Sequence, residues 1–316
     1  MKLLFIIFIL FINISYTYSN ASSDIVTSQK FAKVNRYTSI EGWQANAYWI
    51  ETNSSIIVID TPLLPQDARQ MASAIQLTNK PVKAVFITHP HPDHFAGLAA
   101  LEASFGKFDI IATEKTAAHM STGLKQFLAS GFSKPFGDCV EKRFVPANKI
   151  VKQDTTFKFD GIEFILKDLG PGEAIDNAVV YVPQKKWLFT GDVTMHHMHY
   201  YVGEGRSGNV IQQFKQLKNN FRDSYFFPGH GEPAGVGVLD DHIEYISFVR
   251  ALVNQAINDK ANLNEDKKHL TKSARQKVVQ QILSQYAGLG DFGLDAKMIV
   301  VWSIYGVEKE LLTIQK

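Results

Sequence analysis

Cysteine is almost absent from this chain, which has Cys139 as its only cysteine among 316 residues. A single cysteine cannot form an internal disulfide, so stability must come from the core or from a bound metal. Cys139 lies away from any recognisable motif. We therefore interpret it as structural or incidental, with intermolecular pairing as the alternative.

The chain also lacks an excess of either charge, because its formal net charge is +2 and charged residues make up 20%. This balance does not call for nucleic acid or an anionic membrane as a partner, so we expect a small-molecule substrate and no nucleic acid. The hydrophobic fraction of 45% is that of an ordinary globular protein with a sizeable core.

Long hydrophobic runs are missing after the N-terminus. An apolar run at 3–12 follows Lys2, and Ser19 and Ala21 are small residues of the kind that a signal peptidase recognises. The pattern predicts a signal peptide at 1–21 and a periplasmic or secreted location. The alternative is a retained membrane anchor, although the run is shorter than the roughly 20 apolar residues of a span. We expect no stable membrane span after cleavage.

Strands and helices alternate in the first half of the chain, which is typical of a sheet with helices packed on one face. The apolar periodicity predicts strands at 44–51, 55–60, 82–88 and 109–113, and helices at 65–77, 95–105 and from 114 to about 127.

From about residue 150 the pattern changes to successive strands, followed by helices. The predicted strands are 157–159, 162–166, 178–182 and 186–190, and the predicted helices are 210–221, 240–257 and 274–286. A polar stretch at 258–266 predicts a linker, so we divide the mature chain into a domain at 22–257 and a helical C-terminal extension at 258–316. Apolar residues at 292–305 have three open roles: covering the sheet, shaping a pocket mouth, or forming a homodimer contact.

Four residues with metal-binding side chains lie together between a predicted strand and a predicted helix: His89, His91, Asp93 and His94. Strand alternation places His89 and His91 on one side, and the turn presents Asp93 and His94 in another direction. One short segment can thus serve two neighbouring ions. Imidazole and carboxylate are expected ligands for zinc, manganese or iron. A chance cluster is the alternative, but the chain has only 10 histidines.

This run resembles the signature of the metallo-β-lactamase superfamily, and further similar motifs follow in the same order. They are a glycine-rich turn at 170–177, a strand end at 189–192 and a histidine loop at 227–231. Asp60 matches the acidic residue that closes an early strand in that family. The resemblance covers about 44–257 and implies a four-layer αββα sandwich, here with a C-terminal helical extension.

The resemblance also implies a ligand set for two divalent ions, with zinc expected and manganese or iron as alternatives. The first ion would be bound by His89, His91 and Glu173. The second would be bound by Asp93, His94 and His230, with Asp192 bridging the two. A hydroxide held between the ions would be the nucleophile, and Asp93 would act in catalysis by orienting it or relaying its proton.

Two positions depart from the family pattern or separate its branches. Glu173 stands where histidine is usual, which resembles alkylsulfatases of the same superfamily. Those enzymes bridge with a glutamate and carry further domains. The alternative is that Glu173 points away and the first site is weak. Asp192 separates this chain from the lactamase groups that use a cysteine nearby, so β-lactamase activity is a minority interpretation.

The resulting hypothesis is an exported metal-dependent hydrolase of an ester, lactone, amide or sulfate ester. The alternatives are a mononuclear-iron oxidoreductase, as in persulfide dioxygenases, and a binding module without catalysis. Other residues have open roles. One of His196, His197 and His199 could contact substrate or add a ligand, or the three could form a pocket wall. Trp43 could cover an apolar substrate or simply pack, and Arg206 could meet an anionic group or be solvated. We expect His119 to be a non-ligand.

Overall fold

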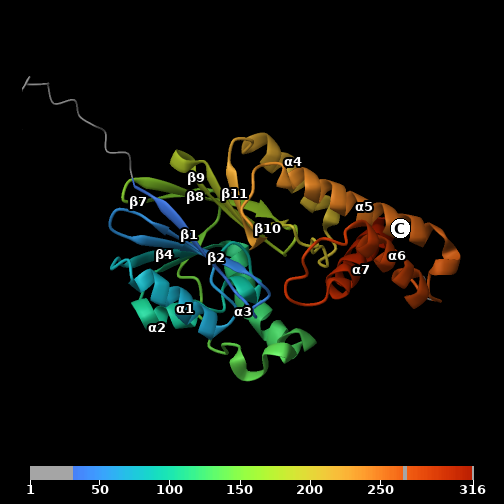
Figure 1. The fold of residues 1–316 in the computed structure, drawn as a ribbon, viewed down its shortest axis with the longest axis horizontal. Coiled ribbons are helices and arrows are strands. Elements are labelled where there is room, and N and C mark those ends of the chain that lie inside the picture. Colours follow the sequence, from blue (N-terminus) through green and yellow to red (C-terminus); the bar gives the residue numbers. More distant parts are fainter. Residues whose placement is uncertain (1–30, 266–268, 315–316) are drawn as a thin grey trace, which may run out of the picture.

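Two β-sheets lie face to face at the centre of the computed structural model, which describes residues 31–265 and 269–314 (Figure 1). The first sheet has 6 strands in chain order. They are β1 (Lys33–Thr38), β2 (Asn46–Glu51), β3 (Ile56–Ile59), β4 (Val82–Phe86), β5 (Asp109–Thr113) and β6 (Lys149–Val151). The predicted signal peptide at 1–21 lies outside the described residues. Within them, no helix combines the length and apolarity that crossing a membrane requires.

The second sheet has 5 strands in the order β11-β10-β9-β8-β7. They are β7 (Thr155–Phe159), β8 (Ile162–Gly170), β9 (Asn177–Val182), β10 (Trp187–His196) and β11 (Tyr225–Gly231). The predicted hairpin of β9 and β10 is confirmed, since Trp187 pairs antiparallel with Val182. The turn at Asp160 and Gly161 likewise joins β7 to β8, as predicted.

The inner layer of the core lies between the two sheets. On β2, Tyr48 and Ile50 face the second sheet, while Ala47 and Trp49 face helices on the other side. Successive side chains of a strand point to opposite faces, so a strand that is buried on both faces is apolar throughout. Tyr48 packs edge to face against Phe189, with ring centroids 5.4 Å apart.

Helices cover the outer face of each sheet (Figure 1). The first sheet is covered by α1 (Pro65–Gln76), α2 (Leu98–Phe105) and α3 (Glu114–Ala129). The second is covered by α4 (Ser207–Asn220), α5 (Val238–Asn258), α6 (Lys272–Gln285) and α7 (Ala296–Ile314). The predicted four-layer αββα arrangement with C-terminal helices is therefore confirmed.

Local sequence signals explain where several helices begin. Pro65 opens α1, a position at which the missing N–H costs no hydrogen bond. The hydroxyl of Thr113 accepts from the Thr116 N–H and caps α3. The helix predicted from residue 95 begins only at Leu98, because a one-turn 3₁₀ helix, Pro92–His94, comes first.

Four strands differ from the sequence prediction. The segment predicted as a histidine loop is strand β11, which pairs parallel to β10 despite Pro228 and Gly229. β10 continues past its predicted end at residue 190, because β11 pairs with it as far as His196. β1 and β6 were not predicted, since their half-exposed residues lack a clear apolar alternation.

The C-terminal helices share one apolar cluster with α4 and α5, so they pack on the sheet as part of its helical layer. Helix α7 lies especially close to the segment after β10. A Cβ at Gly306 would come within 2.2 Å of the Val202 carbonyl oxygen. The Ser303 hydroxyl accepts from the Val202 N–H and donates to the Tyr200 carbonyl. The predicted division of the chain at residue 258 stays a prediction.

His242 on α5 is a buried neutral imidazole within this helical layer. Its Nε2 accepts a hydrogen bond of 3.1 Å from the Met195 N–H, and its ring packs against Tyr200 and Phe214. Burial, together with the charge of His196, lowers the pKa of His242 from 6.5 to about 3. The unfolded chain therefore binds this proton more readily than the folded chain does.

We predict that His242→Gln, which keeps an acceptor but does not titrate, makes the fold less sensitive to acid. The contribution of neutral His242 is complete above its unfolded pKa and is lost as the pH falls toward its folded pKa. By about pH 5 it should cost the wild type about 2 kcal/mol. Denaturant unfolding at about pH 7.5 and about pH 5 measures this. An equal loss of unfolding free energy in both proteins would contradict the prediction.

Candidate metal centre

The histidine run lies at the carboxyl end of β4, where the strand stops at Phe86 and the chain turns. Pro90 and Pro92 fix their own φ angles and stiffen this turn. The turn closes as the His94 N–H donates to the His91 carbonyl at 3.0 Å. The predicted change of direction between His91 and His94 therefore takes place within a single 3₁₀ turn.

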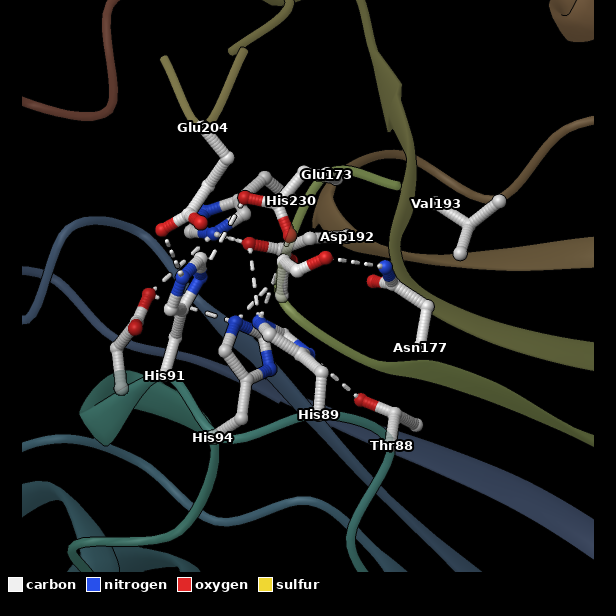
Figure 2. A network of polar contacts seen from close by, with 12 residues as sticks. Thr88, His89, His91, His94, Glu173, Asn177, Asp192, Val193, Glu204 and His230 are labelled. Carbon is white, nitrogen blue, oxygen red and sulfur yellow. Dashed lines mark hydrogen bonds and ion pairs between the residues drawn. The ribbon is translucent and has the colours of Figure 1, made fainter. Parts of the chain in front are cut away.

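The first ligand group consists of His89, His91, Glu173 and Asp192, whose ligand atoms lie within 4.8 Å of one another. His91 Nδ1 lies 3.4 Å from Glu173 Oε1, and His89 Nε2 lies 3.6 Å from Asp192 Oδ2. Glu173 is buried and points into this group. Glu173 therefore does not point away from the site, which was the alternative (Figure 2).

The second ligand group consists of Asp93, His94, Asp192 and His230 and obeys the same distance limit. His94 Nε2 lies 3.1 Å from Asp192 Oδ1 and 3.4 Å from Asp93 Oδ2. His230 Nε2 lies 3.3 Å from Asp192 Oδ2. Asp192 belongs to both groups, which is the place that the resemblance gives to a bridging ligand.

Several atoms of the two groups are buried without a hydrogen-bond partner: His89 Nε2, His94 Nε2, Glu173 Oε2 and Asp192 Oδ1. Buried polar atoms are rarely left unpaired, because desolvation without a replacement partner costs free energy. These atoms converge on shared centres and combine imidazole nitrogens with carboxylate oxygens. The donor set thus fits two divalent cations of the zinc, manganese or iron type.

The pKa shifts in the cluster reflect this crowding of buried charge. Burial and repulsion from Asp192 and Glu204, opposed by His91, raise the pKa of Glu173 to about 8. Burial works against ionisation of Asp192 too, but His94, His230 and His89 hold its pKa well below the usual range. The carboxylates therefore depend on nearby positive charge, which protons or bound cations can supply.

A carboxylate behind the cluster orients two of the histidines. Asp60 accepts from the Thr88 N–H at 2.8 Å and from the Thr88 hydroxyl at 2.7 Å. Its Oδ2 lies 3.1 Å from His94 Nδ1, and the Thr88 oxygen lies 3.0 Å from His89 Nδ1. Engaging both Nδ1 atoms leaves both Nε2 atoms directed at the carboxylates of the ligand groups, as metal-ligating histidines require.

Two glycines allow the backbone to approach the cluster closely. Gly191 has a φ of +48°, and a Cβ there would meet the Thr88 hydroxyl at 2.3 Å. A Cβ at Gly229 would lie 2.0 Å from Asp192 Oδ1. Each glycine is next to a predicted ligand, so the local sequence determines how tightly the ligands converge.

We predict that Gly229→Ala lowers metal affinity, because the added methyl group must displace the Asp192 carboxylate. Gly235→Ala is the matched control, since its Cβ would meet no atom within 4 Å. Metal content after purification and calorimetric titration with zinc measure the effect. Equal metal content and affinity in the two variants would show that Asp192 is not placed by this contact.

The cluster forms the floor of a cleft of about 300 Å³ whose walls are largely apolar. Trp43, for which covering a substrate and simple packing were the alternatives, lines the cleft and also packs against Phe127, with ring centroids 5.2 Å apart. One wall comes from the C-terminal part of the chain and had no assigned role: Phe292, Leu294, Ile299 and Trp302. Of the three open roles for 292–305, the structure thus shows two, which are packing in the layer that covers the second sheet and shaping the pocket.

Glu204 is a site residue that sequence reasoning missed. It lies in the loop after β10 and reaches toward His91 from above the cluster in Figure 2, with Oε1 3.9 Å from His91 Nε2. Arg206 donates to its other oxygen at 2.9 Å, so the guanidinium is paired within the protein. The interaction with His91 and the pairing with Arg206 lower the pKa of Glu204 to about 2. Only a search for acidic residues in that loop could have indicated it.

The other histidines lie outside both ligand groups of the described chain. His196 pairs with the Glu232 carbonyl, and His199 Nδ1 lies 3.0 Å from the Tyr245 hydroxyl. His197 stacks edge to face on His196. His119 is exposed and contacts a carbonyl of its own helix. None of them lines the cleft.

The family model described as the metallo-beta-lactamase superfamily matches residues 40–230, a stretch that contains every predicted ligand. The chain belongs to the metallo-beta-lactamase superfamily. Metallo-beta-lactamase IND-1 of Chryseobacterium indologenes is 26% identical over 211 residues, which cover 65% of this chain and 79% of that protein. The linear primary-alkylsulfatase of a Pseudomonas species is 27% identical and covers 58% of this chain, but only 41% of the sulfatase.

Solved structures show the same fold. The metallo-beta-lactamase from Pontibacter korlensis has a TM-score of 0.53 and 20% identity, covering 70% of this chain and 96% of that one. By sequence, an exodeoxyribonuclease of Streptococcus pneumoniae is also similar, over 40% of this chain and 50% of its own length. These relatives support a metal-dependent hydrolase in general. Their names span three chemistries, so membership of the superfamily does not fix a substrate.

We predict that Glu173→Gln weakens the binding of one of two metal ions by at least about tenfold. Removing a residue that only hydrogen-bonds to a metal ligand already lowers metal affinity by about this factor, and removing a ligand should lower it at least as much. Glu173→His, which restores the usual family residue, should recover the affinity. Glu232→Gln at the surface is the control. Elemental analysis and calorimetry count the ions and measure affinity. Unchanged stoichiometry and affinity in Glu173→Gln would rule Glu173 out as a ligand.

Proposed function

We propose that the protein is a dinuclear metal-dependent hydrolase that acts on an ester, lactone, amide or sulfate-ester bond. One observation carries the proposal: two buried ligand groups share Asp192 at the floor of a substrate-sized cleft. When bound, two divalent ions would activate water and stabilise the negative charge that develops on the substrate. Zinc suits the imidazole-rich donor set, with manganese or iron as the alternatives.

Asp93 is the residue to which we assign proton transfer. It lines the cleft, and Oδ2 lies 3.4 Å from His94 Nε2 and 3.5 Å from His230 Nε2. Burial opposes its ionisation, but His94 and His230 hold its pKa below the usual range, so the group is ionised and would hold a transferred proton only transiently. In hydrolysis of an ester, the water oxygen bonds to the acyl carbon and the bond to the leaving oxygen breaks. The proton taken by Asp93 passes to that leaving oxygen.

The competing functions find less support in the cleft. A mononuclear iron oxidoreductase would need only one of the two ligand groups. A β-lactam carries a carboxylate, and none of the residues that line the cleft in the described ranges is a lysine or arginine to meet it. A binding module without catalysis would not require a carboxylate shared by two ligand groups, as Asp192 is, or a second carboxylate, Asp93, beside it. We also propose that the protein is exported, on the predicted signal peptide alone.

Metal analysis combined with a substrate screen tests the proposed function. We expect two divalent ions per chain and hydrolysis of at least one among esters, lactones, amides, sulfate esters and β-lactams. His94→Ala should lower kcat/KM by at least about a hundredfold, the scale of losing a main electrostatic contributor. His119→Ala, an exposed histidine outside both groups, should leave it unchanged.

Two results would overturn the proposal. One is full turnover by protein freed of metal with a chelator. The other is a single iron per chain together with oxygen uptake, which would favour the oxidoreductase.

A further inference from the structure

The cleft above the metal centre adjoins a second cavity of about 290 Å³ that reaches the surface. Trp43, Phe132, Leu294 and Trp302 line both cavities, so the two lie side by side. The outer part is largely apolar. We call it the apolar trough, and it is lined by Trp43, Gly131, Phe132, Pro135, Leu294, Met298 and Trp302.

Two distant parts of the chain meet at the apolar trough. Phe132 belongs to the 3₁₀ segment Gly131–Cys139, and Trp302 belongs to α7. Their rings meet edge to face, with centroids 4.6 Å apart. Phe132 is 43% exposed and Met298 is 38% exposed. Exposed apolar side chains that continue a buried cleft are typical of a ligand-binding groove.

Charge in the combined cleft disfavours an anionic substrate. Apart from the predicted metal ligands, Glu204 is the charged residue that lines it, and the lining has no lysine or arginine. Arg206 is committed to Glu204. The predicted ligands Asp93, Asp192 and Glu173 carry three negative charges, and so leave only one of the four positive charges of two divalent ions uncompensated.

We propose that the apolar trough binds the aliphatic chain of an uncharged ester or lactone whose acyl carbon lies at the metal centre, with Phe132 and Trp302 as specificity-determining residues. The inference rests on the proposed hydrolase function and names its substrate class. Sulfate esters and β-lactams carry a permanent negative charge, and no lysine or arginine among the described residues lines this cleft to receive it.

The geometry also sets the expected dependence on chain length. A short acyl group fills only the space near Asp93 and leaves the trough to water. Each further methylene that enters the trough is removed from water and should raise kcat/KM about threefold, until the trough is filled.

A series of p-nitrophenyl esters from acetate to decanoate tests this with the zinc-loaded enzyme. We expect kcat/KM to rise with chain length in the wild type. Trp302→Ala and Phe132→Ala should flatten the rise, because they should lower kcat/KM for decanoate more than for acetate. Tyr305→Ala and Phe31→Ala are matched controls, because these aromatic residues are 44% exposed and lie outside the trough. They should keep the wild-type slope.

Binding to metal-free protein gives a second readout that does not depend on turnover. The probes are 10-bromodecan-1-ol and 10-bromodecanoate, whose bromine quenches the fluorescence of Trp43 and Trp302. We expect the alcohol to quench the wild type and Phe31→Ala, and to bind Phe132→Ala at least about fivefold more weakly. The carboxylate should bind more weakly than the alcohol.

The outcomes separate this inference from the proposed function. Equal kcat/KM for all chain lengths, or equal losses for acetate and decanoate in Trp302→Ala, would overturn the trough as a substrate subsite. Equal affinity for the alcohol and the carboxylate would overturn the preference for uncharged substrates. If protein with two ions bound hydrolyses no substrate of any class, the proposed function fails. If the bromoalcohol also quenches Phe132→Ala and the wild type equally, the trough is rejected as a binding site as well.

Discussion

The burial of Asp93, Glu173 and Asp192 within one small volume is the constraint on which the site depends. Three carboxylates this close repel one another, and burial removes the water that would otherwise screen them. Four histidines supply the compensating groups, and Asp192 is shared by both ligand sets. A cation bound among these carboxylates would therefore lower the free energy of the folded chain. A bound cation would also tie together segments that no internal disulfide can join, because Cys139 is the only cysteine.

The two-sheet architecture brings this charge together at one edge of the sandwich. The histidine run follows β4 of the first sheet, while Asp192 and His230 lie on β10 and β11 of the second. Asp60 and Thr88 hold imidazoles from behind, and Gly229 lets β11 approach the Asp192 carboxylate. The rigid apolar layer between the sheets thus fixes the distance between residues that are far apart in the chain, which is the preorganisation that a catalytic metal site needs.

Local signals in the sequence were sufficient for the motif and for most of the fold. His89 to His94 are adjacent along the chain, so their convergence needed no knowledge of topology, and Glu173, Asp192 and His230 followed from the family resemblance. Glu204 was missed, because its proximity to His91 depends on how the loop after β10 folds back. β11 was taken for a loop because Pro228 and Gly229 weaken any strand pattern, and only pairing with β10 makes it a strand. The α7 wall was left open, since an apolar helix can pack on many surfaces.

The close packing of Gly306 against the segment after β10 has a consequence for how this protein could diverge from its relatives. The region that the family model matches ends at residue 230 and holds all seven predicted ligands. The opposite wall of the cleft comes from residues beyond that point. A part of the selectivity proposed for the cleft is therefore encoded outside the stretch of the gene that holds the predicted ligands. Mutation of the last two helices can reshape what enters the cleft while the inherited metal chemistry stays intact.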